Sequence, residues 1–419
     1  MGPLRERNFL FFFVGQSVSS LGNALVPVAL TFALLDLTRS ASDLGYVLGA
    51  EAAAQVSFLL AGGVIADRIS RRTVMLASDV VRGTAEAVLG FLLVTGHPAV
   101  WVIGALAVAQ GAAGAAFLPA TSGLLPAIVS PANLQQANQL QQVSQAAASI
   151  AGPAVAGVLV VAASPGWAIL ADAATFGVSV AMLAALHLDK VSRPAGRRFV
   201  SDLREGWDEF RSFGWLWPMV LAFSLVNLLV GAYSVLGPVA SQRFFGGAAA
   251  WATVATVGGV GSVAGGLMSS RLRRPRARRG RHAARHPLRL GVSLAVFGGS
   301  PPLAFAAGLP VPVIAAVAAV AGTGVIVFMS TFNSTMQRQV PEHALSRVSS
   351  YTWFGASIAY PLGLAIAGPI ASVLPVRTAL LFTGSLWTLA ILSLLSVRDI
   401  RKLTDEAPAL AKQSPVPGG

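Results

Sequence analysis

Residues 43–95 read DLGYVLGAEAAAQVSFLLAGGVIADRISRRTVMLASDVVRGTAEAVLGFLLVT. Two apolar runs, 43–66 and 73–95, are joined by a short loop that is rich in arginine. Each run is longer than the roughly 20 residues that an α-helix needs to cross the hydrocarbon core of a bilayer. Alternation at period two, which is typical of membrane strands, is absent. The stretch therefore predicts two membrane-spanning helices joined by a tight basic turn.

The same pattern repeats along the whole chain. Of its 419 residues, 54% are hydrophobic and only 11% are charged, whereas a soluble protein carries about 25% charged residues. We therefore expect an all-α membrane protein with twelve transmembrane helices. The predicted spans are 8–35, 43–66, 73–95, 99–121, 138–163, 166–188, 215–237, 248–270, 288–308, 311–333, 346–372 and 375–397.

The placement of charge predicts the orientation in the membrane. The net charge of +13 is compatible with nucleic-acid binding, but 26 of the 30 Lys and Arg residues fall on one side of the membrane if the N-terminus is cytoplasmic. That bias follows the positive-inside rule. We predict a multi-pass protein of the cell inner (plasma) membrane, with both termini cytoplasmic and no nucleic-acid partner. The first apolar run is too long for a signal-peptide core, so we expect it to be the first membrane helix.

Internal similarity predicts two related halves. The segment IAGPA at 150–154 is echoed by IAGPI at 366–370, and each falls in the fifth span of its half. Duplicated six-helix halves are a transporter architecture, so we expect two pseudo-symmetric six-helix bundles. The predicted divisions are 1–188 for the first bundle, 189–214 for a cytoplasmic connection with an amphipathic helix, 215–397 for the second bundle and 398–419 for a disordered cytoplasmic tail.

The loop between spans two and three carries the most specific motif. Its residues have the spacing G-x-x-x-D-R-x-x-R-R and are Gly63, Asp67, Arg68, Arg71 and Arg72. Gly63 permits close helix approach, and Asp67 can accept hydrogen bonds from Arg or from amides at a helix N-terminus. Such contacts can hold two bundles together and break on opening. We therefore expect these residues to form an inner gate.

This motif resembles the loop signature of the major facilitator superfamily, G-x-x-x-D-R-x-G-R-R, with Ser70 where the family usually has Gly. In span five, Gly152, Pro153 and Gly157 resemble, in part, a signature of proton-coupled exporters in that superfamily. Pro153 removes an intrahelical hydrogen bond, and the glycines permit tight packing. Further stretches of the first half, among them LPAIV at 125–129, DAATF at 172–176 and SDVVR at 78–82, look like the branch that includes enterobactin and macrolide exporters. The resemblance implies a twelve-span secondary transporter.

Five charged residues fall inside predicted spans, where they are costly unless they face a cavity or a partner. They are Glu51, Asp79, Arg82, Glu86 and Asp172. Helical spacing puts Asp79, Arg82 and Glu86 on one face of span three, and we expect Asp79 to pair with Arg82. A carboxyl withdrawn from water can hold a proton near neutral pH. Glu51 and Glu86 are therefore the main candidates for proton coupling or for binding a cationic substrate, unless they serve packing alone.

The second half has no acid between 210 and 341, so we expect any proton coupling to reside in the first half. Uncharged polar residues inside the spans are further candidates for a substrate path, although such residues more often bond a neighbouring helix. They are Gln16, Asn23, Gln55, Gln110, Asn227, Tyr233 and Asn333.

Other chemistries lack their motifs. The chain has no Cys, its 5 His residues show no metal-ligand spacing, and no lysine stands in the G-x-x-x-x-G-K arrangement of an ATP-binding loop. We therefore predict no catalytic residue, metal, cofactor or ATP, and an ion gradient as the source of energy.

We expect a secondary active transporter that exports a small amphipathic molecule, such as a drug or antibiotic, in exchange for protons by alternating access. A dedicated exporter of a self-made metabolite such as a siderophore is the first alternative. Uptake is a second, disfavoured by the partial Gly-Pro signature. A membrane sensor or scaffold that does not transport is a third, disfavoured by the gate motif.

Overall fold

The computed structural model describes residues 2–96, 98–186, 207, 209–272, 287–398 and 400. Throughout these ranges the chain forms helices and short connections, and no strand occurs in them. The side chains of residues 60–68 lie outside the described part, although the backbone there is helical.

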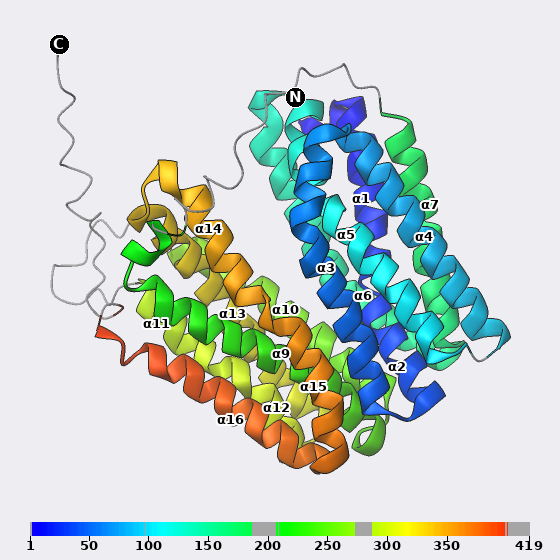
Figure 1. Cartoon of the computed structure of the whole chain (residues 1–419), viewed down its shortest axis with the longest axis vertical. Helices are drawn as coiled ribbons and strands as arrows, with labels where there is room; N and C mark the ends of the chain where they lie inside the picture. The colour runs from blue at the N-terminus through cyan, green and yellow to red at the C-terminus, as the bar shows by residue number, and fades with distance from the viewer. Residues whose placement is uncertain are drawn as a thin grey trace.

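The helices up to residue 184 lie together on the right of Figure 1 and form what we call the first group. Its members are α1 (Arg7–Asn23), α2 (Val26–Thr38), α3 (Ala41–Arg68), α4 (Arg71–Thr95), α5 (Val100–Ile128), α6 (Leu134–Ala162) and α7 (Pro165–Ala184), with the short 3₁₀ helices η1 (Pro3–Arg5) and η2 (Pro131–Asn133).

The helices from residue 216 onward lie together on the left of Figure 1 and form the second group. Its members are α9 (Leu216–Phe244), α10 (Ala248–Leu272), α11 (Pro287–Ala295), η3 (Val296–Gly299), α12 (Ser300–Ala306), α13 (Val311–Gln339), α14 (Glu342–Ser357), α15 (Ala359–Val373) and α16 (Val376–Leu394).

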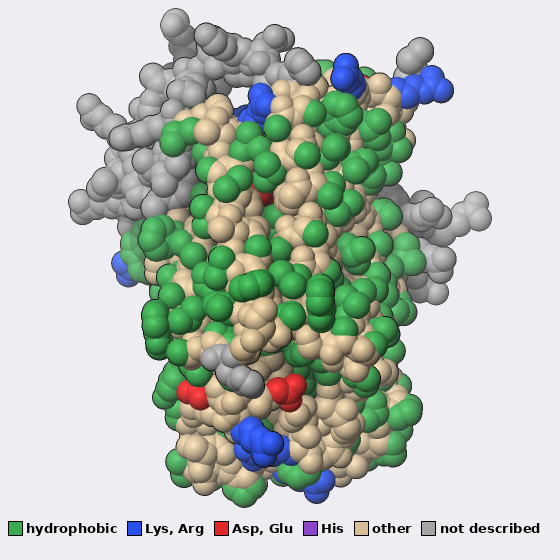
Figure 2. All heavy atoms as spheres, turned by 90° about the vertical axis from the view of Figure 1, so that its right-hand side faces the viewer, with side chains coloured by type: hydrophobic (Ala, Val, Ile, Leu, Met, Phe, Trp, Pro, Cys, Tyr) green, Lys and Arg blue, Asp and Glu red, His purple; other side chains and the backbone are tan. Residues whose placement is uncertain are grey.

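The surface fits a bilayer. In the described residues, 9 helical segments are long and apolar enough to cross one. Large apolar side chains stand exposed on them, among them Trp101 at 75% and Val161 at 68%. Figure 2 shows a mainly hydrophobic middle band on one face, with Lys and Arg gathered at its two ends. Such a band is stable in contact with lipid, because exposing this much apolar surface to water would cost free energy.

The first predicted span is broken into two helices. Pro27 lies at the start of α2 and has no backbone N–H to bond the carbonyl of Asn23, four residues earlier. Helix α1 therefore ends at Asn23. The break places a polar side chain at a helix end inside the protein.

The hydrophobic cores show how the two groups meet. We call the end of the molecule that holds Arg7 and Arg71 the terminal side, and the end that holds Thr38 and Phe244 the far side. On the terminal side each group has its own core: one gathers around Phe9 and Met75, the other around apolar residues of α9, α13, α14 and α16. On the far side a single core contains residues of both groups. The groups are therefore joined on the far side and separately packed on the terminal side, where Figure 1 shows them splayed apart.

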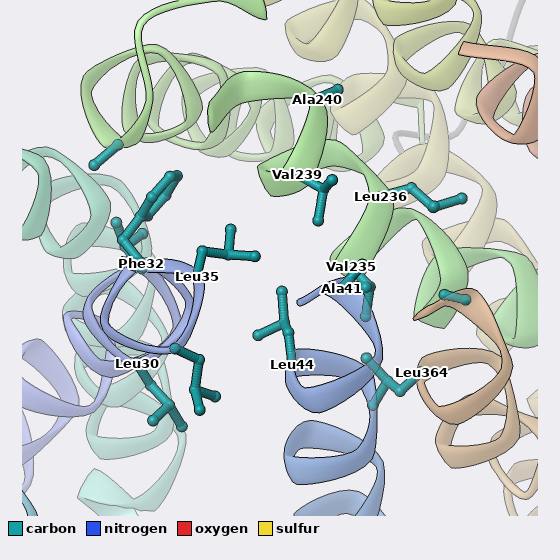
Figure 3. Close-up of a cluster of buried hydrophobic side chains, with 14 of the residues drawn as sticks. Leu30, Phe32, Leu35, Ala41, Leu44, Val235, Leu236, Val239, Ala240 and Leu364 are labelled. Carbon is teal, nitrogen blue, oxygen red and sulfur yellow. The ribbon is translucent and has the colours of Figure 1, made fainter. Parts of the chain in front are cut away.

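Figure 3 shows part of the shared core, in which Leu35 and Leu44 of the first group approach Val235, Val239 and Leu364 of the second. The most extensive contacts between the groups are those of α3 with α15 and of α6 with α10. Glycine makes the first contact close, since a Cβ at Gly45 would lie 2.5 Å from the Leu364 carbonyl oxygen. A hydrogen bond of 3.0 Å from Gln242 Nε2 to Asp36 Oδ1 also joins the groups there.

Only the end of the connection between the groups is described, at Trp207 and 209–214; the rest of the predicted amphipathic helix lies outside the described residues, as does most of the predicted tail. The ring of Trp207 is 5.5 Å from that of Trp217, and Phe210, which is 2% exposed, packs 5.0 Å from the same ring. These apolar side chains therefore rest on the second group.

Candidate transport site

Three carboxylic acids are buried within the first group. Asp79 and Asp172 are 0% exposed and Glu86 is 2% exposed. Asp79 and Glu86 lie on α4, and Asp172 lies on α7, which packs against α4. Of the five charged residues predicted to lie inside spans, the structure thus brings four together, namely these three acids and Arg82.

Asp79 is held by a serine rather than by arginine. Its Oδ2 accepts a hydrogen bond of 2.7 Å from Ser179 Oγ on α7, and its Oδ1 has no partner. The ion pair of Asp79 with Arg82 that helical spacing predicted is not found among the described residues. That prediction was wrong, because neighbouring helices offer both side chains closer partners than each other.

Arg82 turns toward α1 and α7. Its Nη2 donates a hydrogen bond to Asn23 Oδ1, at the end of α1. Its guanidinium carbon lies 4.6 Å from the centre of the Phe176 ring, in a cation–π contact. Asn23 is itself oriented by donating to the Ser19 carbonyl over 2.7 Å. The guanidinium is thus fixed by neutral groups and still acts electrostatically on Glu86 and the other carboxyls of the cluster.

Glu86 and Asp172 lie within hydrogen-bonding reach of each other. Glu86 Oε1 accepts from Gln110 Nε2 on α5, and Asp172 Oδ1 accepts from Thr175 Oγ1 over 2.8 Å. The remaining oxygen of each acid has no donor from the described protein. A proton carried by either acid would supply the missing donor and join the two carboxyls, whereas two ionised carboxylates in contact would repel each other.

Glu51 stands apart from this pair. It lies on α3, which packs against α5 and α15, whereas α4 packs mainly against α7 and α5. Its side chain is only half-buried, and its charge acts on Tyr360 of α15 in the second group. The packing therefore places Glu51 at the contact between the groups and Glu86 inside the first group.

The gate motif is described only at its basic end; the side chains of Gly63, Asp67 and Arg68 lie outside the described residues. Arg71 donates to the Gly123 carbonyl of α5, and Arg72 donates to the carbonyls of Leu183, over 2.8 Å, and of Ala184. Both arginines therefore bind helix ends within the first group. Cations near the C-terminal carbonyls of α7 also suit its dipole.

Ser70, which stands where the family signature has Gly, lies in the turn before α4 and has a structural role there. Its side chain accepts from the Thr73 amide over 3.1 Å and so caps the N-terminus of α4. Its φ is −63°, which any residue can adopt. Glycine is not needed at this turn.

Nearby, the Glu6 carboxylate accepts hydrogen bonds from Asn133 Nδ2 over 2.7 Å and from the amide and hydroxyl of Ser130, each over 2.8 Å. These bonds, that of Asn133 first, hold the pKa of Glu6 below its ordinary value of 4.5. They tie the start of the chain to the connection between α5 and α6 on the terminal side.

The span-five motif makes close contacts on both sides of α6. A Cβ at Gly152 would lie 2.9 Å from the Ala24 carbonyl, at the junction of α1 and α2. A Cβ at Gly157 would lie 2.5 Å from Ala252 Cβ on α10, so this glycine belongs to the contact between the groups. Pro153 lies within the continuous helix α6.

Sequence reasoning missed Ser179 and Thr175 as partners of the buried acids, because small hydroxyls are common in membrane helices and nothing in their spacing singles them out. Among the described residues, no group of three or more His, Asp or Glu side chains is placed to hold a metal ion.

Comparison with known proteins agrees with this architecture. A family model described as Major Facilitator Superfamily matches residues 12–364. Macrolide efflux protein A of Streptococcus pyogenes is 24% identical over 405 residues, covering 94% of this chain and 97% of that protein. The multidrug efflux pump Tap of Mycobacterium tuberculosis is 27% identical over 378 residues, covering 86% of each chain.

Solved structures share the fold. The nucleoside transporter NupG superposes with a TM-score of 0.72 at 11% identity, covering 95% of this chain and 100% of that one. A bacterial homologue of the lysosomal transporter Spinster, in an inward-facing and unoccupied conformation, gives 0.67 at 14% identity, covering 94% and 98%. From the matched family model and the helical architecture together, we conclude that the chain belongs to the major facilitator superfamily and is a multi-pass membrane transporter, not an enzyme.

Proposed function

We propose that the protein exports a small amphipathic molecule from the cell in exchange for protons, by alternating access between two six-helix bundles. The first and second groups are these bundles, joined by the connection at 189–214. The terminal side faces the cytoplasm, as the positive-inside bias favours, and both termini are expected there.

Twelve spans require that α3, α4 and the broken helix α11–α12 also cross the membrane. Helices α3 and α4 have 28 and 25 residues, about 42 and 37 Å of length, which suffices for a bilayer core. The charges of α4 turn inward onto α5 and α7, so they do not prevent its insertion. The stretch Leu290–Ala306 is shorter, and its Gly and Pro residues are tolerated where neighbouring helices cover the break.

The packing supports a transport cycle with this structure as one of its states. The shared core closes the far side, while the separate cores leave the bundles independent on the terminal side. In the alternate state the terminal side closes. We propose that the residues Gly63, Asp67, Arg68, Arg71 and Arg72 form the inner gate that stabilises it.

The contact of Glu86 with Asp172 is the observation that carries the proposal of proton coupling. Two carboxyls in contact inside a low-dielectric bundle are stable when they share a proton, and a single guanidinium, that of Arg82, serves the whole cluster. Glu51 lies where the bundles meet, so its access to either side changes as they rock. A proton can therefore enter from outside through Glu51 and be held at the Glu86–Asp172 pair.

Export of drug-like molecules is supported by the relatives, which are named as macrolide and multidrug efflux proteins. Identities of 24–27% over most of the chain support this class of substrate.

The test is drug accumulation in an efflux-deficient bacterial host that expresses the chain, with and without a protonophore. We expect wild-type protein to lower accumulation of ethidium and of erythromycin, and the protonophore to abolish the difference. The double variant Glu51→Gln/Glu86→Gln removes the proposed entry acid and one acid of the Glu86–Asp172 pair, and it should lose transport driven by a pH gradient in everted vesicles. Asp43→Asn, which removes a half-buried acid at the far-side start of α3, is the control and should keep it. Intact pH-driven transport in the double variant would refute the coupling scheme.

A further inference from the structure

Three consecutive residues at the break between α1 and α2 each contact a different helix of the first group. Gly22 lies against the Asp172 carboxyl of α7, Asn23 accepts from Arg82 of α4, and Ala24 packs on Gly152 of α6. A Cβ at position 22 would overlap Asp172 Oδ1, so glycine is what allows this approach. The break is therefore built directly onto the Glu86–Asp172 pair and its arginine.

Helix α2, which follows the break, takes part in closing the far side. Most of its residues from 28 to 35 belong to the shared core, where Figure 3 shows Phe32 and Leu35. The helix contacts both α9 and α10 of the second group, and its Asp36 accepts the hydrogen bond from Gln242 that joins the groups. A change of angle at the break would therefore act on the contact between the groups.

Arg82 stands between two alternative sets of partners. In this conformation its guanidinium binds the neutral amide of Asn23, which is held in place by its own hydrogen bonds to Ser19. Glu86 lies four residues further along the same face of α4, within reach of a long arginine side chain. A turn of one side chain would move the guanidinium from the amide to the acid pair.

The charge of the acid pair decides between these partners. While Glu86 and Asp172 share a proton, the pair carries one negative charge, and loss of that proton leaves two. Two carboxylates in a low-dielectric bundle attract a guanidinium more strongly than an amide oxygen does. Within the described chain, the other charged groups that act on Arg82 are Asp79 of α4 and Glu51 of α3. Helices α1, α5 and α7 add neutral side chains, among them Asn23, Gln110 and Thr175.

We propose that Asn23 is a positioning residue that, through Arg82, couples the protonation of the Glu86–Asp172 pair to closure of the far side. With the proton in place, Arg82 stays on Asn23, the break is fixed and the far side is closed, as in this structure. Release of the proton to the terminal side draws Arg82 to the acids, frees the break and lets α2 leave the second group. The inference rests on the proton exchange proposed above and specifies how the proton acts on conformation.

The test is the distance across the far side, measured by double electron–electron resonance between two nitroxide labels on the full-length protein in lipid nanodiscs. The chain has no Cys, so Trp101→Cys and Val373→Cys place one label on each group. These positions lie at the start of α5 and at the end of α15, and they are 75% and 82% exposed. We expect the ratio of long to short distances to rise at least about fivefold between about pH 6 and about pH 9.5, a range that covers the titration of buried glutamate.

Two substitutions of Asn23 with opposite effects separate this role from a merely structural one. Asn23→Ala removes the oxygen that holds Arg82, so the far side should open already at low pH and the pH response should fall to within about twofold. Asn23→Asp keeps the shape and binds the guanidinium as an ion pair, so the far side should stay closed up to the highest pH. Glu86→Gln cannot lose a proton and should likewise stay closed. A residue needed only for packing would shift both Asn23 variants in the same direction.

Asn138→Ala is the matched control. Like Asn23, Asn138 donates to the carbonyl four residues earlier in its own helix, but it lies exposed on α6. It should keep the wild-type pH response. If Asn23→Ala does not fold, Asn23→Asp and Glu86→Gln decide. A labelled protein with no pH response, or a wild-type response in Asn23→Asp or Glu86→Gln, would overturn the inference. Such a result together with proton-driven transport would refute this inference alone, whereas the expected responses without proton-driven transport would refute the export proposal alone.

Discussion

A single methyl group at Gly45 should shift the protein away from the conformation described here. The Cβ of an alanine at this position would lie 2.5 Å from the Leu364 carbonyl oxygen, whereas ordinary van der Waals contact begins near 3.4 Å. Helices α3 and α15 would have to separate by roughly 0.9 Å, and such overpacking costs about 1–3 kcal/mol. That energy corresponds to a change of about 5- to 150-fold in the equilibrium between far-side-closed and far-side-open states.

The assay uses the absence of Cys from the chain. Val239→Cys introduces one thiol into the shared core, at a position that is 3% exposed in this conformation. Its rate of reaction with a maleimide, in purified protein, follows the population in which the far side opens. We expect Gly45→Ala to raise that rate by at least about fivefold.

Gly177→Ala is the matched control. A Cβ at Gly177 would meet nothing within 4 Å, and both substitutions gain the same helix propensity, about 1 kcal/mol. The difference between the two variants therefore isolates the contact with Leu364. Equal labelling rates in the two folded variants, within about twofold, would show that the α3–α15 contact does not govern far-side closure.

Two further predictions concern hydrogen bonds inside the first group. Ser179→Ala removes the donor to the buried carboxylate of Asp79 and should lower the free energy of unfolding by about 1 kcal/mol, measured by thermal or denaturant unfolding in nanodiscs. The control is Ser122→Ala, which removes an exposed hydroxyl bonded within its own helix and should have no measurable effect. Glu6→Gln should remove a pH-dependent part of the free energy of unfolding. Hydrogen bonds, chiefly that from Asn133, hold the pKa of Glu6 below 4.5. The ionised Glu6 carboxylate therefore contributes its full stabilisation above pH 4.5, and this stabilisation is lost as the pH falls below that value through the lowered pKa. The difference in unfolding temperature between wild type and Glu6→Gln should therefore shrink on acidification, and a difference that is constant with pH would contradict this role.

The sequence alone determined the membrane character and the family. Exposing apolar groups to water and moving charges through lipid both cost free energy. A membrane protein therefore shows long apolar runs and one-sided placement of arginine, and both can be read directly from the sequence. The motif from Gly63 to Arg72 indicated the superfamily without any tertiary structure, because the motif is recognised from the residue spacing within one loop. The model that matches residues 12–364 confirmed that resemblance.

Only the tertiary structure decided which polar side chains meet. Helical spacing predicted a pair of Asp79 with Arg82, but Asp79 bonds Ser179 on α7 and Arg82 bonds Asn23 at the end of α1. Contacts between helices depend on how the helices pack and not on their order in the sequence. The same reason separates Glu51 from Glu86 and brings Asp172 to Glu86 across 86 positions of sequence.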